Sequence, residues 1–407
     1  MALIVQKFGG TSVGDLDRIR NVATRVKSEV DAGNQVAVVV SAMAGTTNQL
    51  VAWARDIGPV HDAREYDTIV ATGEQVTVGL LAIALQNLGI DARSWLGWQI
   101  PIRTDEVHGA ARIDSIDTTQ MRARLAGGQV AVVAGFQGIG PDGRVATLGR
   151  GGSDTSAVAL AAALNADRCD IYTDVDGVYT TDPRIAPKAQ KLEQITFEEM
   201  LEMASLGAKV LQTRSVAMAM RHNVNLQVRS SFSDAPGTLV VNEDAIVEQE
   251  KISGIAYSPD EAKVTIQGLP DKPGIAAGIF GELADNHINV DMIVQSAASE
   301  GQRTDITFSL GRGDLDKALE IIGGSKETLA FQGIDSKADV TKISVVGTAM
   351  RSQPGVAKTM FETLAERGIN IEVISTSEIK ISVLIASAYT EFAVRSLHAA
   401  FGLDAED

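Results

Sequence analysis

A lysine and two glycines follow a short apolar run near the start of the chain. The stretch reads LIVQKFGGTSVG, with Lys7 two positions before Gly9 and Gly10. In the common phosphate loop the lysine follows the glycines, so this arrangement is a different one. Glycine lets backbone N–H groups approach phosphate oxygens closely, and a lysine neutralises their charge. The stretch therefore predicts an anion site at the end of the first strand.

A second glycine-rich turn, LGRGGSDTSA, leads directly into an apolar helical segment. It contains Arg150, and Ser153 or Asp154 is placed to cap the helix. The N-terminus of a helix offers unpaired N–H groups and a positive dipole end, which suits a phosphate. A tight strand-to-helix turn with no ligand is the plain alternative. The arginine and the aspartate beside the glycines favour a binding site.

A third polar group follows the next buried strand, in the stretch VVVSAMAGTTN. It includes Ser41, Thr46 and Thr47. Ligands of open α/β sheets bind outside the carboxyl ends of the strands, so these side chains, Lys7 and the Arg150 loop are expected along one edge. Backbone amides around phosphates and cations that neutralise charge are the parts that phosphoryl transfer needs.

One glycine motif has a different explanation. The stretch GIGPDG, residues 138–143, satisfies the spacing of a dinucleotide-binding loop. Its Pro-Asp-Gly sequence is a turn signal, and RVATLG after it is typical of a strand. A hairpin is therefore expected there, and dinucleotide binding is rejected.

Strands and helices alternate through the first part of the chain, to about Val241. Continuous apolar runs such as QVAVVV indicate strands buried on both faces, and the alternation indicates a mostly parallel sheet covered by helices. The expected strands are 3–8, 35–43, 128–136 and 169–175, and the expected helices are 15–33, 73–89 and 155–166.

The C-terminal part contains an internal repeat. Residues 271–296 and 352–377 align without a gap at an offset of 81 residues, with Pro273 matching Pro354 and Gly274 matching Gly355. Each copy reads strand, Pro-Gly turn, helix, strand, and is followed by another strand and helix, which is close to the ferredoxin-like plan. Two structural modules or two small-molecule sensors fit this pattern equally well.

Composition bounds the function. A chain of 407 residues predicts about two or three domains. A net charge of −16 argues against nucleic acid and anionic membranes as partners. A single cysteine, Cys169, forbids an intrachain disulfide and fits a cytoplasmic location. No signal peptide and no apolar run close to about 20 residues is evident in the sequence.

Together these motifs resemble one family. KFGGTSVG, VVSAMAGTTN, ATGEQV, LGRGGSDTSA, YTDVDGVYTTDPR and GAKVL occur in the order and at the spacing found in aspartate kinases, and the resemblance covers essentially the whole chain. It implies an α/β fold: an amino-acid-kinase-like three-layer α/β/α sandwich with a mostly parallel sheet, then two ferredoxin-like βαββαβ (ACT) units. The implied boundaries are 1–245, 246–335 and 336–407. A monofunctional enzyme without a fused homoserine dehydrogenase is expected.

The resemblance also implies a reaction. ATP would phosphorylate the side-chain carboxylate of L-aspartate to 4-phospho-L-aspartate, the first step toward lysine, threonine and methionine. Mg²⁺ would be held mainly through the nucleotide phosphates, with no metal site of its own. No general base is needed, because the attacking carboxylate is already ionised near neutral pH.

Residue roles follow from the same resemblance. Lys7, Arg150 and Asp154 would be catalytic, with Asp154 orienting Lys7. Glu74 would bind the substrate ammonium and Arg150 its α-carboxylate, with Thr47 and Ser153 beside them. The implied ATP-binding residues are Lys7, Gly9, Gly10, Ser41, Thr173, Asp174, Tyr179, Arg184 and Lys209.

The repeats would form the regulatory part. A threonine-like effector is expected mainly in the first copy, because Asp271 is replaced by Ser352 in the second. Lysine, if sensed, would bind elsewhere at the paired interface. The implied effector residues are Asp271, Gly274, Ile275, Ala276 and Gln295, with Asn370 and Ile371 from the second copy. A homo-oligomer, or an assembly with a regulatory-half subunit through paired ACT units, is expected.

Two other functions remain open at this point. One is a kinase of the same fold that acts on glutamate or N-acetylglutamate, against which the repeats and the KFGGTS opening argue. The other is a non-catalytic amino-acid sensor, against which Lys7, Glu74, Arg150 and Asp154 argue.

Overall fold

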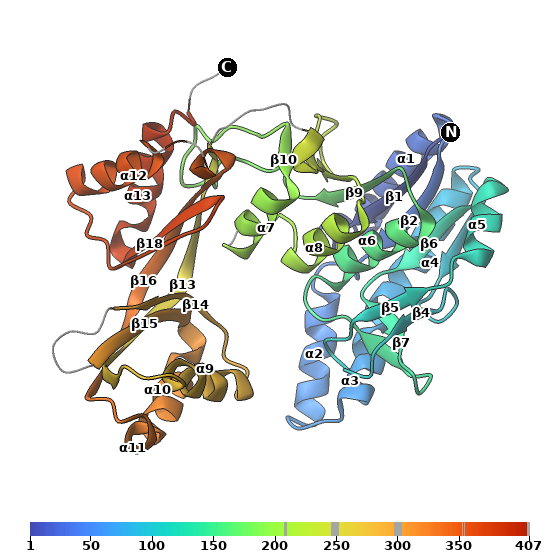
Figure 1. The fold of residues 1–407 in the computed structure, drawn as a ribbon. Coiled ribbons are helices and arrows are strands. Elements are labelled where there is room, and N and C mark those ends of the chain that lie inside the picture. Colours follow the sequence, from blue (N-terminus) through green and yellow to red (C-terminus); the bar gives the residue numbers. More distant parts are fainter. Residues whose placement is uncertain (207–209, 246–251, 297–302, 352, 354, 405–407) are drawn as a thin grey trace. The chain divides into compact units, whose positions relative to one another are not determined.

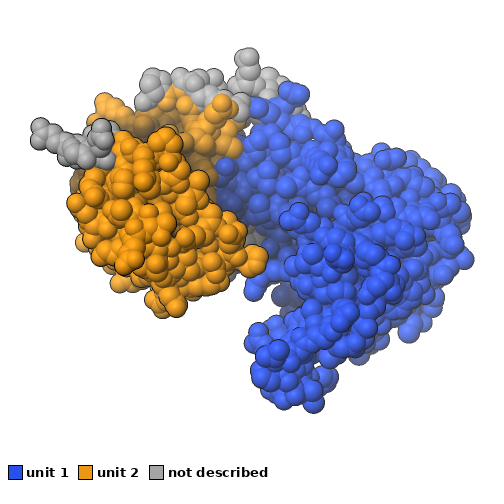
Figure 2. Space-filling view, turned by 60° about the horizontal axis from the view of Figure 1, so that its bottom comes forward, with its two compact units in different colours: residues 1–178, 191–205, 209–247 blue, residues 179–190, 206–208, 248–407 orange. Residues whose placement is uncertain are grey.

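The structure is a computed structural model of the 407-residue chain. It describes residues 1–206, 210–245, 252–296, 303–351, 353 and 355–404. The chain divides into two compact units, which are coloured separately in Figure 2. The first unit consists of residues 1–178, 191–205 and 209–247, and the second of residues 179–190, 206–208 and 248–407.

An eight-stranded sheet forms the centre of the first unit (Figure 1). Its strands pair in parallel except for the two neighbours β11 and β12, so the predicted mostly parallel sheet is confirmed. Across the sheet the strands are β10 (Gln194–Thr196), β12 (Thr238–Val241), β11 (Leu226–Ser230), β9 (Arg168–Thr173), β1 (Leu3–Phe8), β2 (Gln35–Val40), β6 (Val130–Ala134) and β3 (Ala92–Trp95).

Helices cover both faces of this sheet. Val36, Val38 and Val40 of β2 belong to one core cluster with side chains of the helices α1 (Leu16–Asp31) and α4 (Thr72–Asn87). The alternate residues of β2, Ala37 and Val39, are equally buried and therefore face the other helix layer. The remaining helices of the unit are α2 (Thr46–Ile57), α3 (Ala63–Val70), α5 (Thr119–Ala126), α6 (Gly152–Leu164), α7 (Phe197–Ser205) and α8 (Thr213–His222).

A small second sheet in the first unit was not expected from the sequence. It contains β5 (Ile113–Ile116), β4 (Ile102–Thr104), β7 (Gln137–Ile139) and β8 (Val145–Thr147), in that order. β7 and β8 pair antiparallel around a turn in which the N–H of Gly143 donates to the carbonyl of Gly140. The hairpin predicted for the GIGPDG stretch is therefore confirmed.

The second unit contains both repeats in one six-stranded sheet. Its strands, in order, are β14 (Val290–Gln295), β15 (Arg303–Gly311), β13 (Ile252–Pro270), β16 (Gly333–Gly347), β18 (Lys380–Ala386) and β17 (Val373–Thr376). The helices of the first copy are α9 (Ile275–Asp285), α10 (Leu315–Gly324) and α11 (Lys326–Leu329), and those of the second are α12 (Gly355–Glu366) and α13 (Thr390–Ala400). Four short 3₁₀ turns complete the elements described: Glu243–Ala245, Arg312–Asp314, Thr348–Arg351 and Ser387–Tyr389.

The long strand β13 serves both copies. Residues such as Val264 and Ile266, in its second half, are part of the core of the first copy. Ile255, in its first half, is part of the core of the second copy and pairs with Val345 of β16. A boundary at residue 335 separates the two copies in the sequence. It does not separate the two cores, because the first half of β13 packs with the second copy.

The helices α3 and α4 together form a stretch, Ala63–Asn87, that is long and apolar enough to cross a membrane by length and composition alone. Half of its most apolar 18-residue segment is buried inside the protein. Its buried residues include Leu81 and Leu85, which pack in the core beside β2 and β6, and also Glu74. The stretch is thus accounted for as a core helix of the first unit.

Candidate active site

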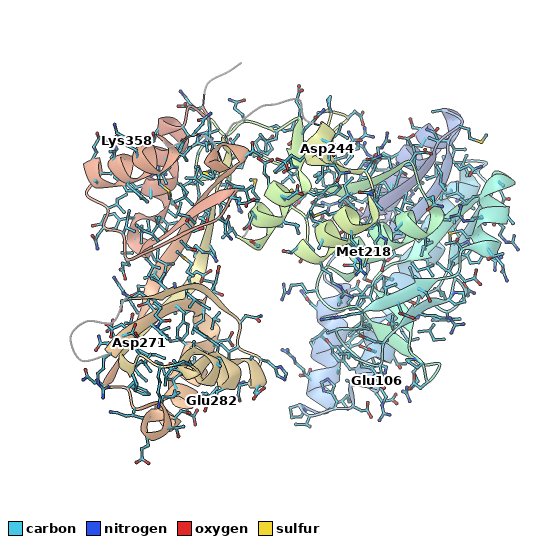
Figure 3. The ribbon with its side chains drawn as sticks, viewed as in Figure 1. Glu106, Met218, Asp244, Asp271, Glu282 and Lys358 are labelled. Atoms are coloured by element: carbon cyan, nitrogen blue, oxygen red, sulfur yellow. The ribbon has the colours of Figure 1, made fainter. Side chains whose placement is uncertain are left out.

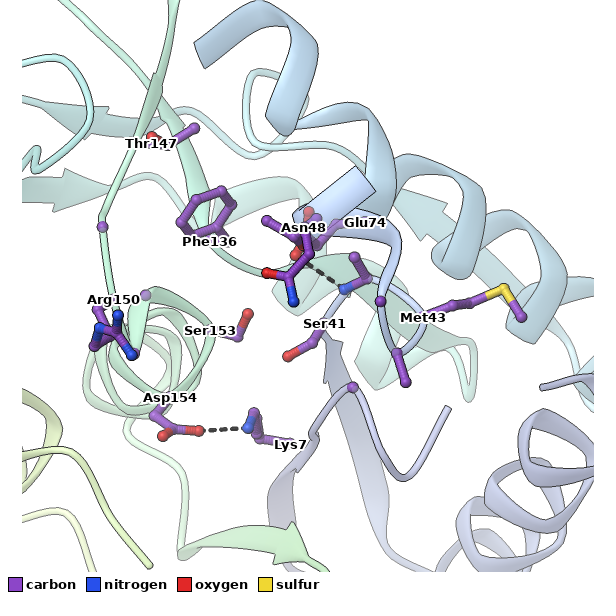
Figure 4. A pocket seen from close by; sticks show the side chains of 18 of the residues that line it. Lys7, Ser41, Met43, Asn48, Glu74, Phe136, Thr147, Arg150, Ser153 and Asp154 are labelled. Carbon is purple, nitrogen blue, oxygen red and sulfur yellow. Dashed lines mark hydrogen bonds and ion pairs between the residues drawn. The ribbon is translucent and has the colours of Figure 1, made fainter. Parts of the chain in front are cut away.

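A cavity of about 540 Å³ opens at the carboxyl ends of β1 and β2 (Figure 4). Eight residues that the sequence singled out line it: Lys7, Gly10, Ser41, Thr47, Glu74, Arg150, Ser153 and Asp154. Its other lining residues are Ala42, Met43, Ala44, Gly45, Asn48, Tyr66, Gly109, Phe136, Thr147, Gly149, Gly151 and Gly152. The three polar segments predicted to converge on one edge of the sheet therefore do so.

Two glycines allow the helices to approach the strand ends closely enough to form this site. A Cβ on Gly73 would lie 2.7 Å from the Cβ of Ala42, just after β2. A Cβ on Gly135 would lie 2.9 Å from the Cβ of Ser153, at the start of α6. Real Cβ contacts are essentially never this short. Glycine is therefore required where α4 and α6 meet the sheet.

Lys7 and Asp154 form an ion pair inside the cavity. Their Nζ and Oδ1 atoms are 2.6 Å apart, and each side chain is only 11% exposed. Lys7 comes from the end of β1, whereas Asp154 comes from the first turn of α6. The carboxylate holds the ammonium in one position, which leaves the remaining N–H groups of Lys7 free to meet an anion in the cavity.

Glu74 is a buried carboxyl group with one oxygen unused. Its Oε1 accepts a hydrogen bond of 2.9 Å from the backbone N–H of Ala42. Its Oε2 has no hydrogen-bond partner among the residues that the structure describes. Burial raises the pKa of Glu74 from 4.5 to about 7, although the bond from Ala42 partly offsets this effect. A buried acceptor without a partner is costly, so Oε2 is suited to a cationic ligand.

The turn that carries Arg150 leads into α6 through glycines in the left-handed conformation. Gly149 has φ +74° and Gly151 has φ +72°, and a Cβ on Gly151 would lie 2.2 Å from Cγ of Gln212. The Arg150 side chain is exposed at the cavity, and no acid pairs with it in the described part of the chain. An unpaired guanidinium is well suited to bind a carboxylate by two hydrogen bonds.

The expected helix cap is wrong. Neither Ser153 nor Asp154 caps α6, since the N-cap is Gly151 and no described side chain makes a cap hydrogen bond there. The left-handed glycine reverses the chain so sharply that both residues fall inside the first turn. The side chain of Asp154 is then available for Lys7.

The remaining residues expected to bind ATP lie outside the lining of this cavity. Gly9 is beside it, because a Cβ on Gly9 would lie 3.3 Å from Nζ of Lys7. Thr173 ends β9, and its hydroxyl donates to Asp174 over 3.0 Å. Tyr179 and Arg184 belong to the segment 179–190 of the second unit. Lys209 lies outside the described residues.

Contacts within the second unit hold the segment 179–190. The carbonyl of Thr180 accepts from the N–H of Ile255 over 2.7 Å, and its hydroxyl lies 2.8 Å from Nε2 of His398. The hydroxyl of Tyr257 donates to Asp182 over 3.3 Å. No pattern in the sequence indicated that this segment packs with the second copy.

Asn48, Phe136 and Thr147 are among the lining residues that were not singled out from the sequence. Asn48 follows Thr47 on the same helix, so the prediction for Thr47 could have included it. Phe136 adopts φ +68°, which is unusual for a residue other than glycine. Thr147 lies at the end of β8, where a strand was expected but no site residue.

The residues expected to bind an effector are near the surface of the second unit (Figure 3 labels Asp271). Asp271, Gly274, Ala276 and Gln295 are exposed, whereas Ile275 is part of the core of the first copy. Gly274 is the N-cap of α9 with φ +95°, and no side chain caps this helix. No described side chain thus caps the first-turn N–H groups of α9, and the binding of an effector there stays a prediction.

The second copy contacts the first copy next to Asn370 and Ile371 in the sequence. Glu372, the next residue, forms an ion pair of 2.9 Å with Lys263 of β13 and a further pair with Lys337. Lys342 of the second copy in turn pairs with Asp291 of the first over 2.7 Å. These reciprocal ion pairs join the two copies around a small buried cluster formed by Met292, Val340, Val373 and Leu384.

Comparison with known proteins identifies the family. Residues 2–230 match the model of the amino acid kinase family, and residues 264–324 and 343–401 each match an ACT domain model. An aspartate kinase of Pseudomonas putida is 54% identical over 406 residues, spanning 100% of this chain and 98% of that protein.

Solved structures agree. The structure of E. coli aspartokinase III with aspartate and ADP has a TM-score of 0.82 and 29% identity, over 98% of this chain and 100% of that one. The structure of the same E. coli enzyme with lysine and aspartate has a TM-score of 0.76 and 30% identity, over 98% and 99% of the two chains. The chain therefore belongs to the aspartate kinase family, with an amino acid kinase domain followed by two ACT domains.

Proposed function

We propose that this kinase transfers the γ-phosphoryl group of ATP to the side-chain carboxylate of L-aspartate, giving 4-phospho-L-aspartate. The observation that carries the proposal is the set of charges around one cavity: the unused oxygen of Glu74, the unpaired guanidinium of Arg150 and the ammonium of Lys7. Glu74 receives the substrate ammonium, and Arg150 receives the α-carboxylate. The side-chain carboxylate is then directed toward Lys7.

The chemistry rests on positioning and charge neutralisation. The attacking carboxylate is already ionised, so no residue has to remove a proton. Lys7 stabilises negative charge on the oxygens of the transferring group, and Asp154 orients it. Gly9 and Gly10 present backbone N–H groups to the phosphates, with Ser41 beside them, and Thr47 and Ser153 complete the pocket for aspartate.

The nucleotide is proposed to bind next to this pocket. Thr173, Asp174, Tyr179, Arg184 and Lys209 are its proposed contacts, and the ADP bound to the E. coli relative supports a nucleotide site in this fold. Of the two acids of the cavity, Asp154 is paired with Lys7, and the unused oxygen of Glu74 is proposed to receive the substrate ammonium. Mg²⁺ is therefore best held through the phosphates, where it would neutralise the charge of the leaving group.

The ACT units are proposed to regulate the enzyme in response to end-product amino acids. Lysine bound to the E. coli relative supports an amino-acid effector, and the open N-terminus of α9 beside Asp271 supports a site in the first copy. Exposed apolar side chains on the edge strands β14 and β17, such as Ile293 and Ile374, support pairing between chains. The enzyme is further proposed to act in the cytoplasm, at the first step of lysine, threonine and methionine synthesis.

A substrate panel tests the reaction. The purified chain with MgATP should release ADP in the presence of L-aspartate, and much more slowly with L-glutamate or N-acetyl-L-glutamate. Faster release with either of the other acids would show a different acceptor. No acid-dependent release in a correctly folded protein would favour a sensor without catalytic activity.

A further inference from the structure

Asp67 of α3 is a fully buried carboxylate that does not line the cavity. Its side chain is 0% exposed, yet it accepts four hydrogen bonds. Oδ2 accepts from the backbone N–H of Thr147 over 2.9 Å and of Gly109 over 3.1 Å, and lies 2.8 Å from Nδ1 of His108. Oδ1 accepts from the hydroxyl of Thr147 over 2.5 Å. Burial of a carboxylate is favourable only when such partners are present.

The donors lie on two segments: Thr147 ends β8, whereas His108 and Gly109 belong to the loop between β4 and β5. Thr147 and Gly109 both line the cavity, and Thr147 comes three residues before Arg150. The two segments also touch directly, because a Cβ on Gly149 would lie 3.0 Å from the carbonyl oxygen of Gly109. Asp67 therefore connects three parts of the structure: its own helix α3, the segment that leads to Arg150, and the loop that contains Gly109.

Other bonds fix the same segment. The carbonyl of Thr147 accepts from the N–H of Ala111 over 2.9 Å. The carbonyl of Leu148 accepts from Arg214 over 2.8 Å, and its N–H donates to the carbonyl of Phe136 over 2.9 Å. Every backbone polar group of residues 147 and 148 is thus held. Among these partners, only Asp67 lies on α3. This helix leads into α4, the helix that carries Glu74.

The ammonium and the α-carboxylate of aspartate are attached to the same carbon atom. The groups that bind them must therefore stand at a fixed separation, and small errors in such positioning are costly. We propose that Asp67 is a positioning residue that fixes the Arg150 turn against α3, which leads directly into α4 and Glu74, and so sets this separation. The inference rests on the proposed roles of Arg150 and Glu74.

Asp67→Asn is the direct test. The amide keeps the size of the side chain but replaces one acceptor oxygen with a donor, which faces the N–H groups of Thr147 and Gly109 or the hydroxyl of Thr147. The KM for aspartate should rise at least about tenfold, in keeping with the cost of misplaced binding groups. The KM for ATP should change much less. Asp142→Asn is the control, since Asp142 accepts a backbone N–H in an exposed turn of the same small sheet.

A purely structural role would give a different result. It would lower the fraction of active protein, and hence the maximal rate, without changing either KM. Unfolding followed by circular dichroism measures the folded fraction. If Asp67→Asn does not fold, His108→Ala removes only one of the four donors, and the folded variant should still raise the KM for aspartate.

A double-mutant cycle with Arg150→Ala separates action through Arg150 from other effects. If Asp67 acts through Arg150, Asp67→Asn should reduce kcat/KM for aspartate much less in the Arg150→Ala background than in the wild type. Equal losses in both backgrounds, or an unchanged KM for aspartate in folded Asp67→Asn or His108→Ala, would overturn the inference. An inactive wild type would instead refute the proposed function.

Discussion

At the scale of single residues, Lys7 is the cation closest to the proposed chemistry. It is nearly buried, and Asp154 holds it at 2.6 Å. Lys7→Ala should lower kcat by about 100-fold or more, because the lost charge acts mainly in the transition state. The variant should still unfold cooperatively, and steady-state kinetics with a thermal melt measures both effects. Turnover close to that of the wild type in a folded variant would remove Lys7 from the mechanism.

Glu74 gives the enzyme a pH dependence of known sign. Its pKa in the free enzyme is raised to about 7 by burial, so below this pH the carboxyl is mostly protonated and cannot attract an ammonium group. The kcat/KM for aspartate should therefore rise with pH through about 7 and level off above it, since this ratio reports the ionisation of the free enzyme.

The variant Glu74→Gln tests that assignment. It keeps the shape but lacks the charge, so its KM for aspartate should rise more than its KM for ATP, and the inflection near pH 7 should disappear. An inflection that persists in the variant would belong to another group. A shift in the KM for ATP alone would mean that Glu74 lies in the wrong pocket.

At the scale of elements, the start of α4 has to touch the end of β2. Gly73→Ala would place a Cβ 2.7 Å from that of Ala42, and neither methyl group can rotate away. In this variant the helix would have to shift, which should lower the free energy of unfolding by about 1–3 kcal/mol. The shift would also strain the hydrogen bond from Ala42 to Glu74. A lower Tm and a higher KM for aspartate are expected.

Gly79→Ala on the same helix is the matched control. Apart from its chain neighbours and the backbone of its own helix, no described atom lies within 4 Å of a Cβ at that position, so alanine should leave catalysis unchanged. It should stabilise the protein by up to about 1 kcal/mol through its better helix propensity. Equal effects of the two variants would mean that the close approach at Gly73 is unimportant.

The sequence predicted the elements that carry a strong pattern. The strands β2 and β6 are continuous apolar runs, β1 begins with one, and α1 has a clear amphipathic period, so each was found within a few residues. β4 was not predicted, because its three residues are too few to show a period. The cap of α6 was missed because a left-handed glycine took the position expected for a polar side chain. Lys7 and Ser41 were found because they follow strong strands, and Arg150 and Asp154 because a glycine-rich turn leads into a helix, whereas Glu74 was found only through the family resemblance.

At the scale of the whole molecule, the exchange of segments between cores was not visible in the sequence. Ile255 is as apolar as any strand residue of the first copy, and only tertiary packing assigns it to the second. Thr180 likewise lies in the motif YTDVDGVYTTDPR, which begins in the first unit, yet it bonds to Ile255 and His398 of the second unit. Local patterns report which residues are buried, but they do not report which core buries them.

Regulation also belongs to this scale. Asp271→Ala should reduce inhibition by threonine while leaving the uninhibited kcat nearly intact, because Asp271 is exposed in the second unit and is proposed to meet the effector ammonium. Inhibition requires that the effector bind two states of the enzyme with different affinity. Titration with threonine, with and without lysine, measures the effect.

Asp285→Ala is the control for that variant, since Asp285 is an exposed acid at the other end of α9. It should leave the inhibition curve unchanged. If Asp271→Ala also leaves the curve unchanged, either the effector site lies elsewhere or threonine is not an effector.

The central claim is that the side-chain carboxylate of aspartate attacks the γ-phosphorus of ATP. Aspartate labelled with ¹⁸O in that carboxylate tests it most directly. After turnover with MgATP, hydroxylamine attacks the acyl carbon of the product and expels phosphate with the bridging oxygen. Each phosphate released should carry one ¹⁸O atom, and none should carry label when only the α-carboxylate is labelled. Label from the α-carboxylate, or unlabelled phosphate in both experiments, would contradict it.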